Sequence, residues 1–155
     1  MSKLRDLLRK LKRAKDELPK LKASIAGEIT KEVKLRIEKQ ILSGAGYEPI
    51  SPITPTFNSQ FRVSRSGGVP LIDTGALKSS VKVETRNHSG GFTITAHSDL
   101  VYARFQQEGG TTPLGTEVPG RPFIELAFES LGRLTVGKIC QKHTKNYLKT
   151  IFRVG

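Results

Sequence analysis

The sequence predicts an α+β fold in which a small antiparallel β-sheet with a central hairpin packs against long N- and C-terminal helices. Two observations carry this prediction. Amphipathic segments of helical period lie at both ends of the 155-residue chain. Between them, two runs of alternating residues flank a stretch rich in Asn and Gly, which is typical of a β-hairpin.

The N-terminal part is expected to form two helices. In residues 1–18, apolar residues recur every three or four positions and make one face of a basic amphipathic helix. Pro19 is expected to break or kink it, because proline lacks an N–H and crowds the preceding turn. A second helix is expected from Leu21 to Leu42, with apolar residues at steps of four: Ile25, Ile29, Val33, Ile37 and Ile41. Residues 1–18 are therefore interpreted as a separate helix and residues 19–155 as a single domain.

The middle of the chain is expected to contain a long loop and then the hairpin. Residues 47–69 hold three prolines and no visible period, which predicts an extended loop. Residues 81–85 and 92–96 alternate and form the two strands, whereas residues 100–108 are too short to assign. Residues 109–115 are interpreted as a loop.

The C-terminal part is expected to be helical. Pro122 suits the first turn of a helix, and residues 132–137 are a weak point because a glycine stands at each end. The last helix has two distinct faces. Its apolar side holds Val136, Ile139, Cys140, His143, Tyr147 and Ile151, and its basic side holds Lys138, Lys142, Lys145 and Lys149.

The net charge of +12 is confined to the two ends. Residues 1–22 hold nine Lys and Arg against three acids, residues 133–155 hold six against none, and the stretch between them is neutral. Such ends indicate binding of a partner or a solvated surface. No apolar run approaches the ~20 residues that span a bilayer, so no membrane contact is expected. The single Cys140 excludes an intramolecular disulfide, and a reducing cytoplasm is expected.

No catalytic or cofactor site is expected. His88, His97 and His143 lack metal-ligand spacing, and the glycine pairs lack the context of a phosphate-binding loop. One motif does point to an enzyme. Leu71–Ala76 matches the active-site signature of retroviral-type aspartic proteases, in which two Asp carboxylates share a proton. Those enzymes are almost wholly β, and Leu77 stands where they carry a second Asp. The protease is therefore kept only as an alternative.

Three motifs in order give the segment from Pro70 to Phe123 a more specific meaning. Pro70-Leu71-Ile72-Asp73-Thr74-Gly75-Ala76-Leu77 precedes the hairpin, and Tyr102-Ala103-Arg104-Phe105-Gln106-Gln107-Glu108-Gly109 and Val118-Pro119-Gly120-Arg121-Pro122-Phe123 follow it. This order resembles the phage virion morphogenesis (tail-completion) family and related neck proteins of long-tailed phages, over about residues 20–150. Many members carry His where this chain has Gln106 or Gln107. The first 18 residues have no counterpart in the resemblance.

The resemblance implies a non-enzymatic structural protein that helps to join a phage head to its tail. Such proteins act as homo-oligomeric rings, often six-fold, beside head-connector and tail-tube proteins. The expected location is the neck or tail of the virion, after assembly in the host cytoplasm. The residues expected at subunit or partner contacts are Asp73, Thr74, Gly75, Leu77, Tyr102, Glu108, Arg121, Pro122 and Phe123.

Several of these residues also have a purely structural interpretation. Phe123 can belong to the core while Arg121 pairs with an acid such as Glu108 or Asp73, and the sequence favours core positions for Tyr102 and Phe105. On the last helix, the candidate contacts to DNA or to an acidic partner are Lys138, Lys142, Lys145 and Lys149. Contact with DNA would be salt-dependent and without base readout. A solvated face is the alternative.

Overall fold

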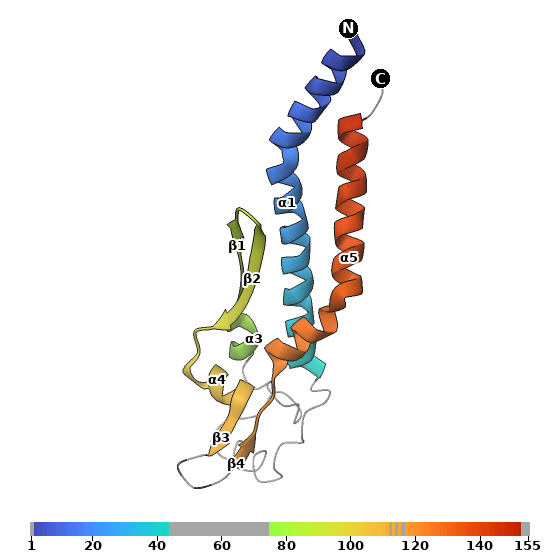
Figure 1. Cartoon of the computed structure of the whole chain (residues 1–155). Coiled ribbons are helices and arrows are strands. Elements are labelled where there is room, and N and C mark those ends of the chain that lie inside the picture. Colours follow the sequence, from blue (N-terminus) through green and yellow to red (C-terminus); the bar gives the residue numbers. More distant parts are fainter. Residues whose placement is uncertain (1, 44–74, 112, 114, 116, 153–155) are drawn as a thin grey trace. The chain divides into compact units, whose positions relative to one another are not determined.

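The computed structural model describes residues 2–43, 75–111, 113, 115 and 117–152 (Figure 1). Its elements are α1 (Ser2–Ser43), α3 (Ala76–Ser80), β1 (Val81–His88), β2 (Gly91–Ser98), α4 (Val101–Glu108), β3 (Gly109–Thr111), β4 (Glu117–Pro119) and α5 (Phe123–Phe152). The predicted α+β class, with long terminal helices and a small antiparallel hairpin, is confirmed. The predicted loop 47–69 lies outside the described residues.

The chain divides into two compact units, and both long helices contribute to each of them. The helical unit comprises Met1–Glu32, Thr85–Ile94 and Leu131–Gly155, and the mixed unit comprises Val33–Glu84 and Thr95–Ser130. All of the net charge belongs to the helical unit, which holds 17 Lys and Arg against five Asp and Glu. The mixed unit holds nine of each sign and is neutral.

Helix α1 runs without interruption through Pro19, so of the two predicted outcomes, a break or a kink, the break is wrong. Proline removes one backbone hydrogen bond and crowds the preceding turn, which a long helix can absorb by bending. Figure 1 shows the axis of α1 changing direction in its N-terminal third. The steps of four predicted the buried side correctly, since Ile29, Val33, Ile37 and Ile41 are all buried.

In the helical unit, the tip of the hairpin and the last part of α5 lie against α1. Lys22 Nζ donates to the Ser89 carbonyl at 3.2 Å, and the hydroxyls of Thr30 and Thr85 lie 2.6 Å apart. The Tyr147 hydroxyl donates to the Ala14 carbonyl and ties α5 to the N-terminal half of α1. The buried apolar residues of this unit are Ala26, Ile29, Leu131, Ile139 and Ile151.

In the mixed unit, polar contacts join the base of the hairpin to α4. The hydroxyls of Ser80 and Ser98 lie 2.7 Å apart, and Ser98 Oγ also accepts from the backbone N–H of Leu100, immediately before α4. Lys82 pairs with Asp99, which lowers the pKa of the Asp99 carboxyl and raises the pKa of Lys82. These contacts fix where α4 begins.

A second small sheet follows α4, where a loop was expected. β3 pairs antiparallel with β4, with Gly109 opposite Pro119, Gly110 opposite Val118 and Thr111 opposite Glu117. The prediction for residues 109–115 is therefore wrong over its first three residues. Strands this short carry no alternation, so their pairing depends on residues distant in sequence.

Helix α5 contains one break, at the weak point that the sequence predicted. Gly132 has φ 59° and ψ 155°, outside the helical region, so two helical segments meet there. A positive φ is a conformation that glycine adopts without the steric cost of a Cβ. The part of α5 that belongs to the helical unit begins at Leu131, one residue before this break.

Candidate interaction surfaces

The segment Arg121–Phe123 is anchored by two neighbouring glutamines of α4. Gln106 accepts from the Arg121 backbone N–H through its carbonyl at 2.8 Å, and its Oε1 lies 3.4 Å from Arg121 Nη1. Gln107 Oε1 accepts from the Ile124 N–H at 3.2 Å, in the first turn of α5. The first four N–H groups of a helix have no partner within it, so this side chain caps α5. Sequence reasoning did not assign these roles to the glutamines.

Two predicted contact residues prove to be core. Phe123 has no exposed surface and Leu77 is 3% exposed, both within the mixed unit. The structural interpretation of Phe123 is therefore correct, whereas Pro122 is half-buried. Gly75 precedes α3 with φ 76°. Asp73 and Thr74 lie outside the described residues.

Two further predicted contact residues, Tyr102 and Glu108, lie on the surface. Tyr102 is 44% exposed, so the expectation that it belongs to the core is wrong, and Val101 beside it is 97% exposed. Phe105 is half-buried. Glu108 is exposed and pairs with Arg104 one helical turn away, at 2.9 Å. Tyr102 and Val101 together leave an apolar surface at the start of α4.

Arg121 is buried without the predicted Glu108 partner. The residue is 6% exposed, and its Nε has no hydrogen-bond partner among the described residues. Asp73, the other acid predicted to pair with it, lies outside the described residues. No carboxylate among the described residues forms a salt bridge with it, since Glu108 is held by Arg104. A buried guanidinium without a countercharge is unfavourable. Packing around the aliphatic stem of Arg121 and the hydrogen bond to Gln106 partly offset this cost.

We expect Arg121→Met to leave the free energy of unfolding unchanged or to raise it by about 1–3 kcal/mol, because methionine keeps the apolar stem and removes the buried charge. Urea denaturation of the two proteins measures the difference. Arg104→Met is the control, since Arg104 forms an exposed pair that contributes little. A loss of about 3 kcal/mol or more in Arg121→Met would show that a carboxylate does pair with Arg121.

The second candidate surface is the basic side of α5 in the helical unit. Lys138, Lys142, Lys145 and Lys149 are all exposed, as their spacing predicts. Lys142 is engaged, because its Nζ donates to both oxygens of Glu28 on α1 at 2.9 and 3.0 Å. His143 Nε2 lies 2.6 Å from Glu28 Oε2. Glu28 thus holds α5 against α1.

These two contacts lower the pKa of the Glu28 carboxyl, with the hydrogen bond from Lys142 as the larger cause and that from His143 as the second. A carboxyl with a lowered folded pKa contributes stability above its unfolded value of about 4.5, and this contribution is lost as pH falls through the folded pKa. We therefore expect Glu28→Gln to lower the melting temperature near pH 6, by an amount that becomes smaller as the pH falls below about 4.5.

Circular dichroism melts of both proteins across that range measure this difference. Asp16→Asn is the matched control, because Asp16 is exposed on the same helix and has no salt bridge to a described residue. If the melting temperatures of the unaltered chain and of Glu28→Gln differ by the same amount at every pH, the role assigned to Glu28 is contradicted.

Neither a metal site nor a membrane span is found in the part of the chain that the structure describes. No group of three or more His, Cys, Asp or Glu side chains there could hold a metal ion. None of the described helices combines the length and apolar character needed to cross a bilayer. The architecture is also unlike the almost wholly β fold of retroviral-type proteases, the class that the Asp-Thr-Gly motif resembles.

A model of the phage virion morphogenesis family matches residues 1–144. The chain belongs to this family. No curated protein and no solved structure matches it. The family match begins at residue 1, so the basic N-terminal helix does have a counterpart in this family. The expectation that the first 18 residues have none is therefore wrong. Membership in the phage virion morphogenesis family supports a structural role in the phage virion.

Proposed function

We propose that this virion morphogenesis protein is a neck or tail-completion component that helps to join the phage head to the tail by assembling into a ring. The observation that carries the proposal is the family match over residues 1–144, which includes the three motifs from Pro70 to Phe123. Enzymatic activity is not part of this role. Assembly on neighbouring copies requires exposed apolar surface that association can cover.

The mixed unit offers such surface outside its core. Four large apolar residues are exposed in its described part: Leu35 (62%), Leu42 (49%), Val101 (97%) and Tyr102 (44%). The unit is also neutral overall, so copies of it do not repel one another through net charge. These two properties make it the part of the chain that we assign to contacts between subunits. Head-connector and tail-tube proteins are the proposed neighbours of the ring.

Native mass spectrometry of the full chain tests the proposal. We expect a closed oligomer of one defined copy number, and six is the number that the resemblance favours. Val101→Ser with Tyr102→Ser should shift the mass towards the monomer. Leu134→Ser is the control, since Leu134 is 83% exposed but belongs to the helical unit. A monomer at every concentration would overturn ring assembly.

Non-specific contact with DNA is a second candidate function, favoured by the basic side of α5. Lys138, Lys145 and Lys149 are exposed and form no salt bridge with the described residues. Such a contact predicts affinity for duplex DNA that falls steeply with salt and is lost when these three lysines are changed to Gln. If the variant binds DNA as tightly as the unaltered chain, the basic side of α5 is not the DNA-binding surface.

A further inference from the structure

The N-terminal part of α1 presents a row of leucines that nothing in the described structure covers. We call this row, which consists of Leu4, Leu7, Leu8, Leu11 and Leu18, the leucine face. Its members are between 44% and 62% exposed. Their spacing of three and four residues places them on one side of the helix. Full burial of one leucine contributes about 1.5–3 kcal/mol, so five exposed leucines mark a docking surface.

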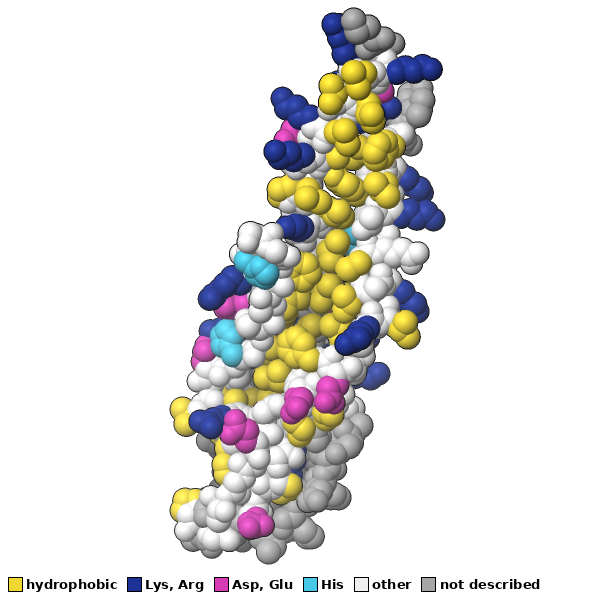
Figure 2. Space-filling model, in the orientation of Figure 1, with side chains coloured by type: hydrophobic (Ala, Val, Ile, Leu, Met, Phe, Trp, Pro, Cys, Tyr) yellow, Lys and Arg dark blue, Asp and Glu magenta, His cyan; other side chains and the backbone are white. Residues whose placement is uncertain are grey.

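The part of α5 that lies against this region adds to the same apolar surface. Leu148 and Phe152 are 45% and 46% exposed, and Tyr147 holds α5 to α1 at Ala14. Figure 2 shows hydrophobic side chains gathered over the N-terminal part of α1 and the adjoining part of α5, with Lys and Arg side chains around them. Two helices therefore contribute to one surface.

The charge around the leucine face is mainly positive, with seven Lys and Arg against three Asp and Glu in residues 1–18. Two of the three acids are already paired, since Asp6 lies 2.7 Å from Arg9 and 2.9 Å from Lys10, and Glu17 lies 3.4 Å from Arg13. The hydrogen bonds from Lys10 and Arg9 lower the pKa of Asp6. Four further cations within residues 1–18 form no salt bridge with a described residue: Lys3, Arg5, Lys12 and Lys15. These four cations could therefore form salt bridges with carboxylates of a partner.

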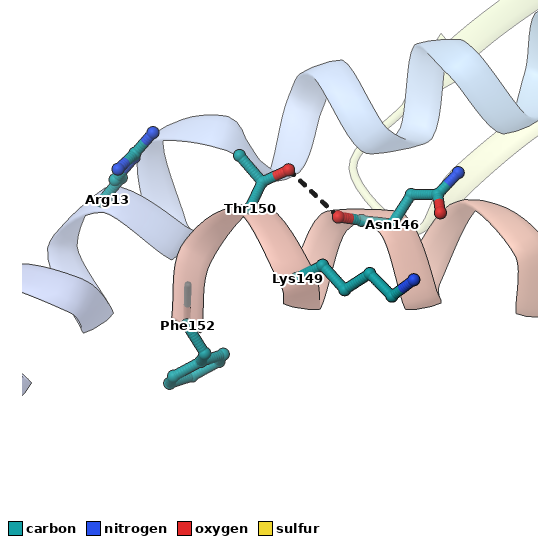
Figure 3. A pocket seen from close by; sticks show the side chains of 5 residues that line it. All are labelled: Arg13, Asn146, Lys149, Thr150 and Phe152. Carbon is teal, nitrogen blue, oxygen red and sulfur yellow. Dashed lines mark hydrogen bonds between the residues drawn. The ribbon is translucent and has the colours of Figure 1, made fainter. Parts of the chain in front are cut away.

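An open hollow of about 740 Å³ is lined by Arg13 from α1 and by Asn146, Lys149, Thr150 and Phe152 from α5 (Figure 3). The Thr150 hydroxyl donates to the Asn146 carbonyl at 3.0 Å, within α5. At about 100° per residue, Arg13 lies on the side of α1 opposite to the leucine face. This hollow is therefore separate from the apolar surface that the leucines form.

We propose that the leucine face binds an amphipathic helix, rich in Asp and Glu, of a different protein. Its apolar side would cover the leucines, and its carboxylates would meet Arg5, Lys12 and Lys15, which are exposed on the same part of α1. Helix-in-groove recognition of this kind uses anchors at positions i, i+3, i+4 and i+7. Opposite charges would speed association and prevent binding of the wrong partner.

Charge complementarity selects this occupant over the others. A second copy would bring the same cationic segment against itself, and juxtaposed like charges are unfavourable at an interface. A nucleic acid would neutralise the lysines but leave the leucines in water. Helices that bind a lipid surface commonly carry Trp or Phe beside Leu on the apolar side, and residues 1–22 contain neither.

The inference does not depend on ring assembly. It concerns the helical unit, whereas the proposed contacts between copies lie in the mixed unit. Failure of the oligomer test would leave the leucine face as a docking surface for an acidic helix. Failure of the peptide test below would leave ring assembly untouched.

A synthetic helical peptide of about 20 residues, long enough to span about 30 Å, serves as the probe. It carries Leu at positions i, i+3, i+4 and i+7 and Glu on both flanks, with a fluorophore for anisotropy. We expect it to bind the full chain, with affinity that weakens at about 0.5 M salt because screening shortens the range of the attraction. A peptide with Lys in place of Glu should not bind.

Variants of the protein locate the binding surface. Leu7→Ser with Leu11→Ser and, separately, Lys15→Glu should each weaken binding by about tenfold or more. Leu35→Ser and Lys39→Glu are the matched controls, because both residues are exposed on α1 but belong to the mixed unit. All of these residues are exposed, so circular dichroism should show unchanged helix content and melting temperature.

The proposal is overturned if the acidic peptide does not bind, or if the leucine variants bind it as well as the unaltered chain does. The measurements also identify another occupant. A drop in native mass in Leu7→Ser/Leu11→Ser, without peptide binding, would assign the face to a second copy. Retention on phosphatidylserine vesicles or duplex DNA through these leucines, without peptide binding, would assign it to a membrane or a nucleic acid.

Discussion

Replacing Phe123 by alanine is expected to lower the free energy of unfolding by about 3–5 kcal/mol, which is the usual cost of truncating a fully buried phenylalanine. Its side chain has no exposed surface, and its backbone N–H donates to the Arg121 carbonyl at 2.7 Å. The cap from Gln107 to Ile124 holds the same turn of α5. The neighbouring structure can therefore relax only partially into the space that the ring leaves.

Urea denaturation of Phe123→Ala measures this loss, and Phe152→Ala is the matched control. Phe152 is the same residue type in the same helix but is 46% exposed, so its truncation should cost less than about 1 kcal/mol. Equal losses in the two variants would show that Phe123 is not a core residue.

Replacing Gly109 by alanine is expected to cost about 2–5 kcal/mol, the sum of left-handed strain and overpacking. Gly109 ends α4 with φ 75°, and its N–H donates to the Phe105 carbonyl. A Cβ at this position would lie 2.5 Å from the Gly120 nitrogen and 2.6 Å from the Val118 oxygen. Both of these atoms belong to the backbone, so the side chain cannot be accommodated without moving β4.

Gly115→Ala separates the cost of left-handed strain from the cost of overpacking. Gly115 has φ 79°, close to that of Gly109, but nothing lies within 4 Å of an added Cβ. Its substitution should therefore cost only the strain, about 1–2 kcal/mol. Urea denaturation of the two variants gives the comparison. A loss in Gly109→Ala no larger than that in Gly115→Ala would contradict the close approach of α4 and β4.

The elements that were predicted correctly are those with a long local period. The steps of four from Ile25 to Ile41 identify the buried side of α1, and Gly132 marks the break in α5. In both cases the signal lies within a single element. The apolar period does not, however, show whether another element covers the apolar side of the helix. The leucines of residues 4–18 show the same periodicity as a buried stripe, yet they are exposed.

The features that were missed depend on residues far apart in the sequence. The pairing of β3 with β4 joins two three-residue strands, which are too short to show alternation. Glu108 was a possible partner for Arg121, but Arg104 one turn earlier on α4 takes it. The sequence carried no sign that Gln106 binds Arg121 or that Gln107 caps α5, because a glutamine in a short helix has no distinctive spacing. Asp73 and Thr74 remain predicted contacts.

Electron microscopy of phage particles with gold-labelled antibody against this chain would test its proposed place in the virion most directly. We expect the label at the junction between head and tail, and its loss from particles that lack the gene. Label confined to another part of the particle, or particles without any label, would contradict the proposal that this virion morphogenesis protein completes the neck or tail.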